Sequence, residues 1–227
     1  MGRLNQAYYN VAAPGSLPVR IGARQRRKMF DAFLAASAIA EEDTLLDVGV
    51  TSDQSYQNSN YVEEWYPHKS KITAVGIDDA SFLEQQYYGL RFVLADGRNL
   101  PFGDNSFDYV HSSAVLEHVG SRANQVQFLH QLWRVCRKGI FVTTPNRWFP
   151  IEFHTVLPLV HWLPPRQFRR ILSLIGKSFF AQEENLNLMS HRDLIRTARD
   201  AGMEGVVIHF ACLGPWPTNL MLWARKH

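Results

Sequence analysis

Two short stretches decide the fold of this chain: Leu45–Gly49, which reads LLDVG, and Val75–Asp78, which reads VGID. Each is an apolar run that meets an acidic residue, the pattern of a buried strand where it leaves a sheet. Enough residues lie between Gly49 and Asp78 for one helix and its turns. In a parallel sheet such strand ends share one edge, where a tight glycine turn and an acid can surround a ribose-bearing ligand.

Further apolar runs alternate with helical patterns on both sides of these stretches. On a helix at 125–136, we expect Val126, Leu129, Trp133 and Cys136 to point inward. The alternation predicts an α/β fold in which helices cover both faces of a mostly parallel sheet. The expected strands are 44–48, 72–77, 90–95, 107–112 and 139–143, with a closing antiparallel pair at 205–210 and 219–225 around a Gly-Pro-Trp-Pro turn. The other expected helices are 24–40, 56–66, 81–88 and 191–201.

The length of 227 residues fits one such domain, which we place at 24–227. Residues 1–23 are expected to form an N-terminal arm, because Pro14, Gly15 and Pro18 interrupt regular structure. Residues 146–189 form a connection longer than a compact sheet needs. We predict that this insertion is a lid or substrate cap over the strand ends.

The charge balance argues against a general polyanion-binding protein, because 24 basic and 21 acidic residues leave a net charge of +3. The basic run from Arg20 to Lys28 is interpreted as a solvated helix face. The two cysteines share no motif, so we expect neither a disulfide scaffold nor a cysteine zinc site. No apolar run reaches the ~18 residues of a membrane span. We expect a cytoplasmic protein.

The acids at the strand ends occur in a fixed order: Asp47 with Gly49, then Asp78, then Asp96 with Gly97. The runs LPFGDNSFDYV at 100–110 and SAVLEHV at 113–119 follow. This ordered set resembles class I S-adenosylmethionine-dependent methyltransferases of the type 11, small-molecule group. The resemblance implies a Rossmann-like seven-stranded sheet, a lid insertion after strand five, and S-adenosyl-L-methionine as the cofactor.

The resemblance also implies which residues bind this cofactor. Asp47 and Gly49 match the first loop of the family, at the amino-acid end of the cofactor. Residues 50–53 replace the family's further glycines there, and Ser52 is expected to bond the cofactor carboxylate. The other matched positions are Asp78 for the ribose hydroxyls, Asp96 and Gly97 for the adenine edge, and Ser112 near the transferred methyl group.

A base that removes the acceptor's proton is expected among the histidines, because their pKa lies near neutrality. The predicted catalytic residues are His154 and Glu152 in the lid and His111 near the end of its strand. Glu152 and His154 lie among aromatic residues, which suits a pocket for a ring or sugar. A lid core with a buried histidine fits the same residues. The aromatic neighbours are Trp148, Phe149 and Phe153, and the further histidine candidates are His118 and His161.

SAVLEHV resembles the corresponding segment of ubiquinone-pathway O-methyltransferases, in which a glutamate three positions before the Glu-His pair helps to bind a divalent metal. The matching position here is Ala114, so that metal set is incomplete. We therefore predict no metal, and interpret Glu117 and His118 as shaping the start of the next helix.

Methyl transfer to a small-molecule acceptor is the expected function, preferably to an oxygen of a sugar, a quinone or a lipid-linked molecule. An apolar stripe with basic neighbours at 166–180 either packs on its own domain or contacts an anionic membrane surface. An RNA methyltransferase is an alternative that the near-neutral charge disfavours. A non-catalytic relative is another, because the glycine loop is altered.

Overall fold

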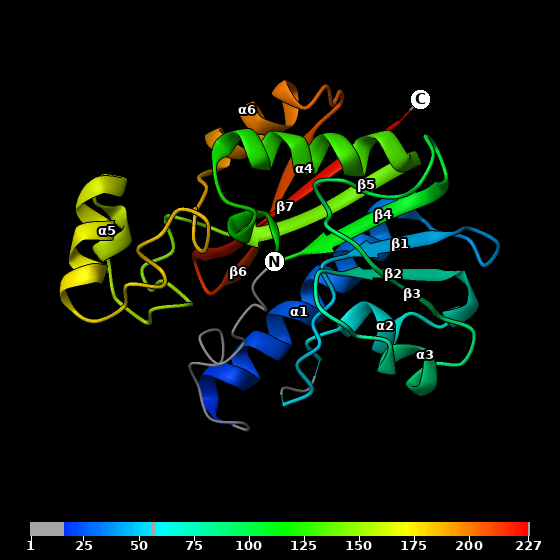
Figure 1. Cartoon of the computed structure of the whole chain (residues 1–227), viewed down its shortest axis with the longest axis horizontal. Helices are drawn as coiled ribbons and strands as arrows, with labels where there is room; N and C mark the ends of the chain where they lie inside the picture. The colour runs from blue at the N-terminus through cyan, green and yellow to red at the C-terminus, as the bar shows by residue number, and fades with distance from the viewer. Residues whose placement is uncertain (1–15, 56–57, 227) are drawn as a thin grey trace.

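Seven strands form one sheet, in the order β3-β2-β1-β4-β5-β7-β6, in the computed structural model (Figure 1). The structure describes residues 16–55 and 58–226. Strands β1 to β5 are parallel, and β7 is antiparallel to both β5 and β6. The predicted Rossmann-like, mostly parallel sheet with a closing antiparallel pair is confirmed. The strands are β1 Leu45–Val48, β2 Ile72–Gly76, β3 Arg91–Leu94, β4 Phe107–Ser113, β5 Cys136–Pro145, β6 Val207–Leu213 and β7 Trp216–Arg225.

Helices cover both faces of this sheet, as predicted. In Figure 1, α4 and α6 lie on one face of the sheet, and α1, α2 and α3 lie on the other. The second and third helices are shorter than expected, five residues each. The helices are α1 Leu17–Ser37, α2 Tyr61–Trp65, α3 Phe82–Gln86, α4 Arg122–Val135, α5 Pro165–Leu174 and α6 His191–Asp200, with short 3-10 turns η2 Lys69–Lys71, η3 Leu116–His118 and η4 Val160–Trp162.

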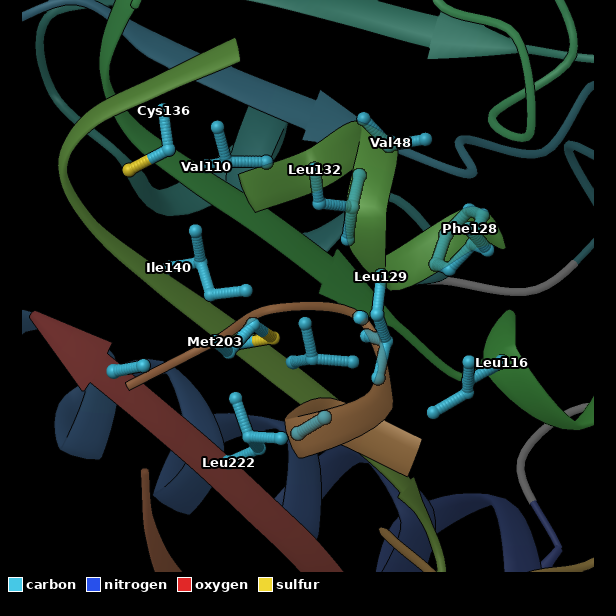
Figure 2. Close-up of a cluster of buried hydrophobic side chains, with 14 of the residues drawn as sticks. Val48, Val110, Leu116, Phe128, Leu129, Leu132, Cys136, Ile140, Met203 and Leu222 are labelled. Carbon is cyan, nitrogen blue, oxygen red and sulfur yellow. The ribbon is translucent and has the colours of Figure 1, made fainter. Parts of the chain in front are cut away.

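The core between the sheet and α4 is formed by apolar side chains from both (Figure 2). Phe128, Leu129 and Leu132 of α4 are fully buried there. Val126 and Trp133, expected to point inward, are only partly buried, and Cys136 is the first residue of β5. The difference arises because the buried positions follow the 3.6-residue period from Gln125 through 128, 129 and 132.

The first helix begins earlier than predicted, at Leu17 rather than at residue 24. Pro18 falls in the first turn of α1, where a missing N–H costs nothing, so this proline does not break the helix. The expected arm therefore has no structural boundary at residue 23, and its residues 1–15 lie outside the described part. Of the basic run, Arg20, Arg24, Arg27 and Lys28 are exposed as predicted, whereas Arg26 is partly buried.

The insertion at 146–189 leaves and rejoins the sheet at one point, because Asn146 and Met189 form a parallel bridge. Its helix α5 projects beside the sheet at the left of Figure 1 and packs on its own small cluster through Phe168 and Leu172. The predicted stripe is shorter than expected, since α5 ends at Leu174 and Gly176 takes a left-handed conformation with φ of 79°. Contact of 166–180 with a membrane stays a prediction. Within the described residues, the helices are too short or too polar to span a bilayer.

Candidate functional site

A large cavity of about 1280 Å³ lies at the carboxyl edge of the parallel strands. The strand order reverses between β1 and β4, and ligands of open α/β sheets bind outside the strand ends at such a point. The loops after β1, β2 and β3 form one side of the cavity, and the insertion forms another. From the predicted site, the cavity is lined by Gly49, Ser52, Asp78, Asp96, Gly97, Glu152 and His154.

The loop after β1 turns sharply at Gly49, whose φ is 109°. Its N–H donates to the carbonyl oxygen of Val75 at 2.7 Å, which holds the loop against β2. A Cβ on Gly49 would lie 2.0 Å from Cγ2 of Val115, so both the space and the backbone require glycine. Asn60 pairs with the backbone of Thr51 in both directions, at 2.9 Å each, and fixes the part of the loop that lacks further glycines. Sequence reasoning missed Asn60.

Asp78 is half-buried and lines the cavity just after β2. The adjacent Asp79 is exposed, and its side chain accepts from the Ser81 N–H at 2.9 Å. Asp96 lines the cavity after β3 and pairs with Arg98, whose Nη2 lies 2.6 Å from Asp96 Oδ2. The Arg98 guanidinium holds the pKa of Asp96 below its usual range, so Asp96 is a carboxylate that can accept a further hydrogen bond.

Three predicted site residues do not line the cavity: Asp47, His111 and Ser112. Ser112 is fully buried, and its Oγ donates to the carbonyl of Val48 at 2.7 Å. His111 has no exposed surface, and Nδ1 lies 2.6 Å from Asp47 Oδ1. Burial lowers the pKa of His111 to about 4. The prediction that His111 is a base at the reacting centre is wrong, because β4 turns this side chain beneath the sheet edge rather than into the cavity.

Beneath the loop, Asp47 and His111 belong to a buried polar cluster that also contains Tyr61 and Glu63. The Tyr61 hydroxyl lies 3.0 Å from Nε2 of His111. Glu63 is fully buried, and neither of its carboxylate oxygens has a hydrogen-bond partner in the described part of the chain. Burial, together with the neighbouring charge of Asp47, raises the pKa of Glu63 well above its usual value. Glu63 is therefore protonated over a wider pH range in the folded chain than in the unfolded one.

Replacing Glu63 with glutamine is expected to stabilise the protein at pH 8, by about 1–3 kcal/mol, because no buried carboxylate then forms. In the wild type, the folded state holds this proton more tightly than the unfolded chain, whose glutamates titrate near pH ~4.3. The free energy of unfolding therefore falls as the pH rises above that value. Urea unfolding at pH 5 and pH 8 measures the effect. Glu64→Gln, at the exposed neighbour, should leave the pH dependence unchanged; equal slopes for Glu63→Gln and wild type would contradict the argument.

On the opposite side of the cavity, the insertion brings His154 against His118. Their Nε2 atoms are 3.0 Å apart. Nδ1 of His154 lies 2.7 Å from Glu152 Oε1, and Nδ1 of His118 lies 2.7 Å from the carbonyl oxygen of Asn185. Glu117, just before His118 on η3, is fully buried, and its Oε2 accepts from the Thr144 hydroxyl at 2.9 Å. The structure thus unites Glu152 and His154, which were predicted as a pair, with the Glu117-His118 motif.

The electrostatics of this cluster favour one positive charge between two carboxylates. Burial and the charge of His154 lower the pKa of His118 to about 3. Burial opposes protonation of His154 too, but the hydrogen bond and charge of Glu152 raise the pKa of His154. Burial raises the pKa of Glu117. The two imidazoles cannot both be charged at this distance, so a single cationic centre is the stable arrangement.

The remaining predictions for the insertion are partly wrong. Phe149 and Phe153 stack at 5.1 Å between ring centroids and line the cavity, as expected. Trp148 is half exposed and lies outside the cavity lining. His161 is buried away from the cavity, and its Nε2 donates to the carbonyl of Phe149 at 2.8 Å, so its role is structural.

Arg26 lines the cavity from α1, although the sequence analysis assigned it to a solvated face. Burial lowers the pKa of this guanidinium. Among the α1 residues that line the cavity, Gly22, Gln25, Arg26 and Met29 are spaced i, i+3, i+4 and i+7; Val19 and Ile21 line it too. That spacing marks one helix face and could have identified Arg26.

Comparison with known families gives a match between residues 46–143 and a family model described as a methyltransferase domain. The matched segment runs from β1 to β5 and contains the glycine loop, Asp78, Asp96 and Gly97. No curated protein sequence matches this chain.

Several solved structures share the fold. One is magnesium protoporphyrin IX methyltransferase from Synechocystis PCC 6803 with bound SAH, with 15% identity and a TM-score of 0.61 over 98% of this chain and 92% of that one. Another is the Burkholderia thailandensis 1,6-didemethyltoxoflavin-N1-methyltransferase with bound 1,6-didemethyltoxoflavin and S-adenosylhomocysteine, at 18% identity and a TM-score of 0.54 over 95% and 93%. A SAM-dependent methyltransferase from Methanosarcina mazei gives 15% identity and a TM-score of 0.53 over 83% and 94%.

Proposed function

We propose that this chain is an S-adenosylmethionine-dependent methyltransferase that methylates a small organic molecule; the methyltransferase-domain model matches its residues 46–143. The observation that carries the proposal is the cavity of about 1280 Å³ that the strand ends share with the insertion. Pockets for one drug-sized ligand typically measure ~300–1,000 Å³, so this cavity has room for a cofactor and an acceptor together.

The described residues fit the cofactor. Gly49 and Gly97 line the cavity and carry no side chain, and a Cβ at these positions would overlap Val115 and Phe128 respectively. Backbone without side chains can approach a ligand closely. We assign Asp78 to the ribose hydroxyls, because a carboxylate accepts two hydrogen bonds from a diol. Asp96 and the backbone at Gly97 are assigned to the adenine edge, and Gly49 and Ser52 to the amino-acid end.

When bound, S-adenosylmethionine supplies a methyl group on a positively charged sulfur. The chain has little covalent chemistry to perform and acts by holding the acceptor atom in line with that methyl group. The aromatic pair Phe149 and Phe153 packs on the acceptor and excludes water, while Glu152 and His154 contact its reacting group. Oxygen is the proposed acceptor atom, because a hydroxyl both accepts and donates hydrogen bonds to such a polar cluster.

Replacing Asp78 with alanine is expected to weaken S-adenosylhomocysteine binding at least about tenfold. The change removes one or more charge-assisted hydrogen bonds, each worth roughly 1.5–3 kcal/mol. Calorimetric titration measures the affinity. Asp79→Ala removes the same charge one residue away, outside the cavity lining, and should bind like wild type. Equal affinities for the two variants would remove Asp78 from the site.

The acceptor class is tested by transfer of a labelled methyl group from S-adenosylmethionine to phenols, quinols, sugars and a structured RNA, each with wild type and Asp78→Ala. Transfer to a small hydroxylated molecule, lost in Asp78→Ala, would support the proposal. Transfer to RNA alone would overturn it. Failure to bind S-adenosylhomocysteine at all would favour a non-catalytic relative.

A further inference from the structure

We propose that Glu117, His118 and His154 bind a divalent transition-metal ion, zinc in the simplest case, at the acceptor end of the cavity. The proposed ligand atoms are one oxygen of Glu117 and the Nε2 atoms of the two histidines. One ligand atom from each residue lies within 4.8 Å of the others. Only the role of the ion in methyl transfer rests on the function proposed above; its binding does not.

The hydrogen bonds at the far side of each imidazole orient both Nε2 atoms as acceptors. The carbonyl of Asn185 can only accept, so His118 carries its proton on Nδ1, 2.7 Å away. His154 points Nδ1 at Glu152 Oε1, also at 2.7 Å. A protonated His154 donates its Nε2–H to Nε2 of His118 across 3.0 Å, and without that proton both Nε2 atoms have lone pairs facing the same space. A divalent ion beside them replaces the proton, and anchoring of Nδ1 by a carboxylate or carbonyl is the arrangement that orients metal-binding histidines.

The third ligand is a buried carboxylate oxygen. Glu117 is fully buried, its Oε2 accepts from Thr144, and its Oε1 has no hydrogen-bond partner among the residues that the structure describes. This Oε1 lies 3.8 Å from Nε2 of His118, on the side of the histidine pair. An unpaired carboxylate oxygen in such a place costs free energy, which a bound cation would offset.

The donor set selects the class of metal. Two imidazole nitrogens and one carboxylate suit zinc and its neighbours, whereas magnesium and calcium prefer oxygen ligands. His118 and His154 both line the cavity, so a molecule in the cavity can supply a fourth ligand. Three protein ligands with an open position form a catalytic rather than a structural site.

The ion would join the insertion to the sheet and activate the acceptor. Glu117 and His118 follow β4, while His154 belongs to the insertion, so binding would hold the lid against the strand ends. An acceptor hydroxyl on the ion loses its proton more readily, and that proton passes to water. The oxygen lone pair then forms the bond to the methyl carbon, and the electrons of the carbon–sulfur bond stay on sulfur.

The test is calorimetric titration of chelator-treated full-length protein with zinc chloride, with and without the substitutions. Wild type is expected to bind one zinc per chain saturably. His154→Ala and Glu117→Gln each remove a ligand and should lower the affinity at least about tenfold. Glu152→Gln keeps all three ligands and should lower the zinc affinity about 10- to 100-fold, because it only weakens the hydrogen bond that orients His154. His209→Ala removes an exposed histidine on β6 and should change nothing.

Cobalt(II) gives a readout that needs no variant, since its visible absorption reports nitrogen and oxygen ligands at low coordination number. A saturable band at one equivalent, displaced by zinc, is expected. No saturable zinc binding, or equal affinity for wild type, His154→Ala and Glu117→Gln, would overturn the site. Binding of S-adenosylhomocysteine is measured separately, so failure of the cofactor site and failure of the metal site are distinguishable.

Discussion

Gly49→Ala is expected to destabilise the protein by about 2–5 kcal/mol and to weaken S-adenosylhomocysteine binding at least about tenfold. A left-handed backbone costs an L-residue roughly 1–2 kcal/mol, and overpacking in a tight site adds about 1–3 kcal/mol. The overlap is severe, because the new Cβ would lie 2.0 Å from Cγ2 of Val115. Relieving it must move Val115 or the loop, and both line the cavity.

Urea unfolding and calorimetric titration measure these two effects. Gly103→Ala is the matched control, because the nearest atom to its Cβ would be Ser106 Oγ at 3.7 Å; it should change stability by less than ~0.5 kcal/mol. In the double variant Gly49→Ala/Val115→Ala, the overlap with Val115 is relieved. Its free energy of unfolding should therefore recover in part, and the cost of the left-handed backbone should remain. Equal stability and equal affinity of Gly49→Ala and wild type would contradict the left-handed turn and the close contact with Val115 at position 49.

Phe128→Ala is expected to lower the free energy of unfolding by about 3–5 kcal/mol, as for other buried aromatic rings. Phe128 on α4 is fully buried and belongs to the core cluster (Figure 2). The same residue lines the cavity. Its ring packs so closely on Gly97 that a Cβ there would lie 2.5 Å from Phe128 Cε2. Removing the ring therefore opens a void directly beside the adenine-edge position.

This contact predicts strong coupling between Phe128 and Gly97. Gly97→Ala should lower the free energy of unfolding more in the wild-type background than in the Phe128→Ala background. The double variant should deviate from additivity by about 0.5–3 kcal/mol. Part of the cost should remain, because Val48 Cγ1 would still lie 2.9 Å from the new Cβ. Urea unfolding of the two single variants and the double variant measures the coupling. The partly buried Val126→Ala on the same helix is the control, and strict additivity with Gly97→Ala is expected for it.

Local patterns predicted the strands well, and helix faces less well. Runs such as Leu45–Val48 are buried on both faces, so their composition alone marks them. The inward face of α4 was partly misplaced, because Val126 and Trp133 each lie one residue after a buried position, and one residue is a rotation of about 100° around a helix. The start of α1 was predicted too late because Pro18 was taken as a helix breaker. A proline breaks a helix in its interior but is tolerated in its first turn.

The predicted site residues fall into two groups, those that line the cavity and those that lie beneath the sheet edge. Asp78, Asp96 and Gly97 follow directly from their strands, and the parallel topology brings them to one cavity. Asp47, His111 and Ser112 occupy equally suggestive positions, but the pleat directs them beneath the sheet edge, where they bond to one another and to the backbone. A strand residue one place earlier or later points to the opposite face, and sequence does not show which face borders the cavity.

The sequence by itself determined the α/β class and the order of the strand-end acids, because these depend on short local patterns. It indicated the cofactor through the family that this order resembles. Only the tertiary structure decided that His154 lies 3.0 Å from His118, 36 residues away, and that Glu63 is buried beside Asp47. Arg26 likewise reaches the cavity only because α1 packs across it. Such contacts depend on how a long insertion or a helix folds back on the sheet, and no local pattern encodes that distance.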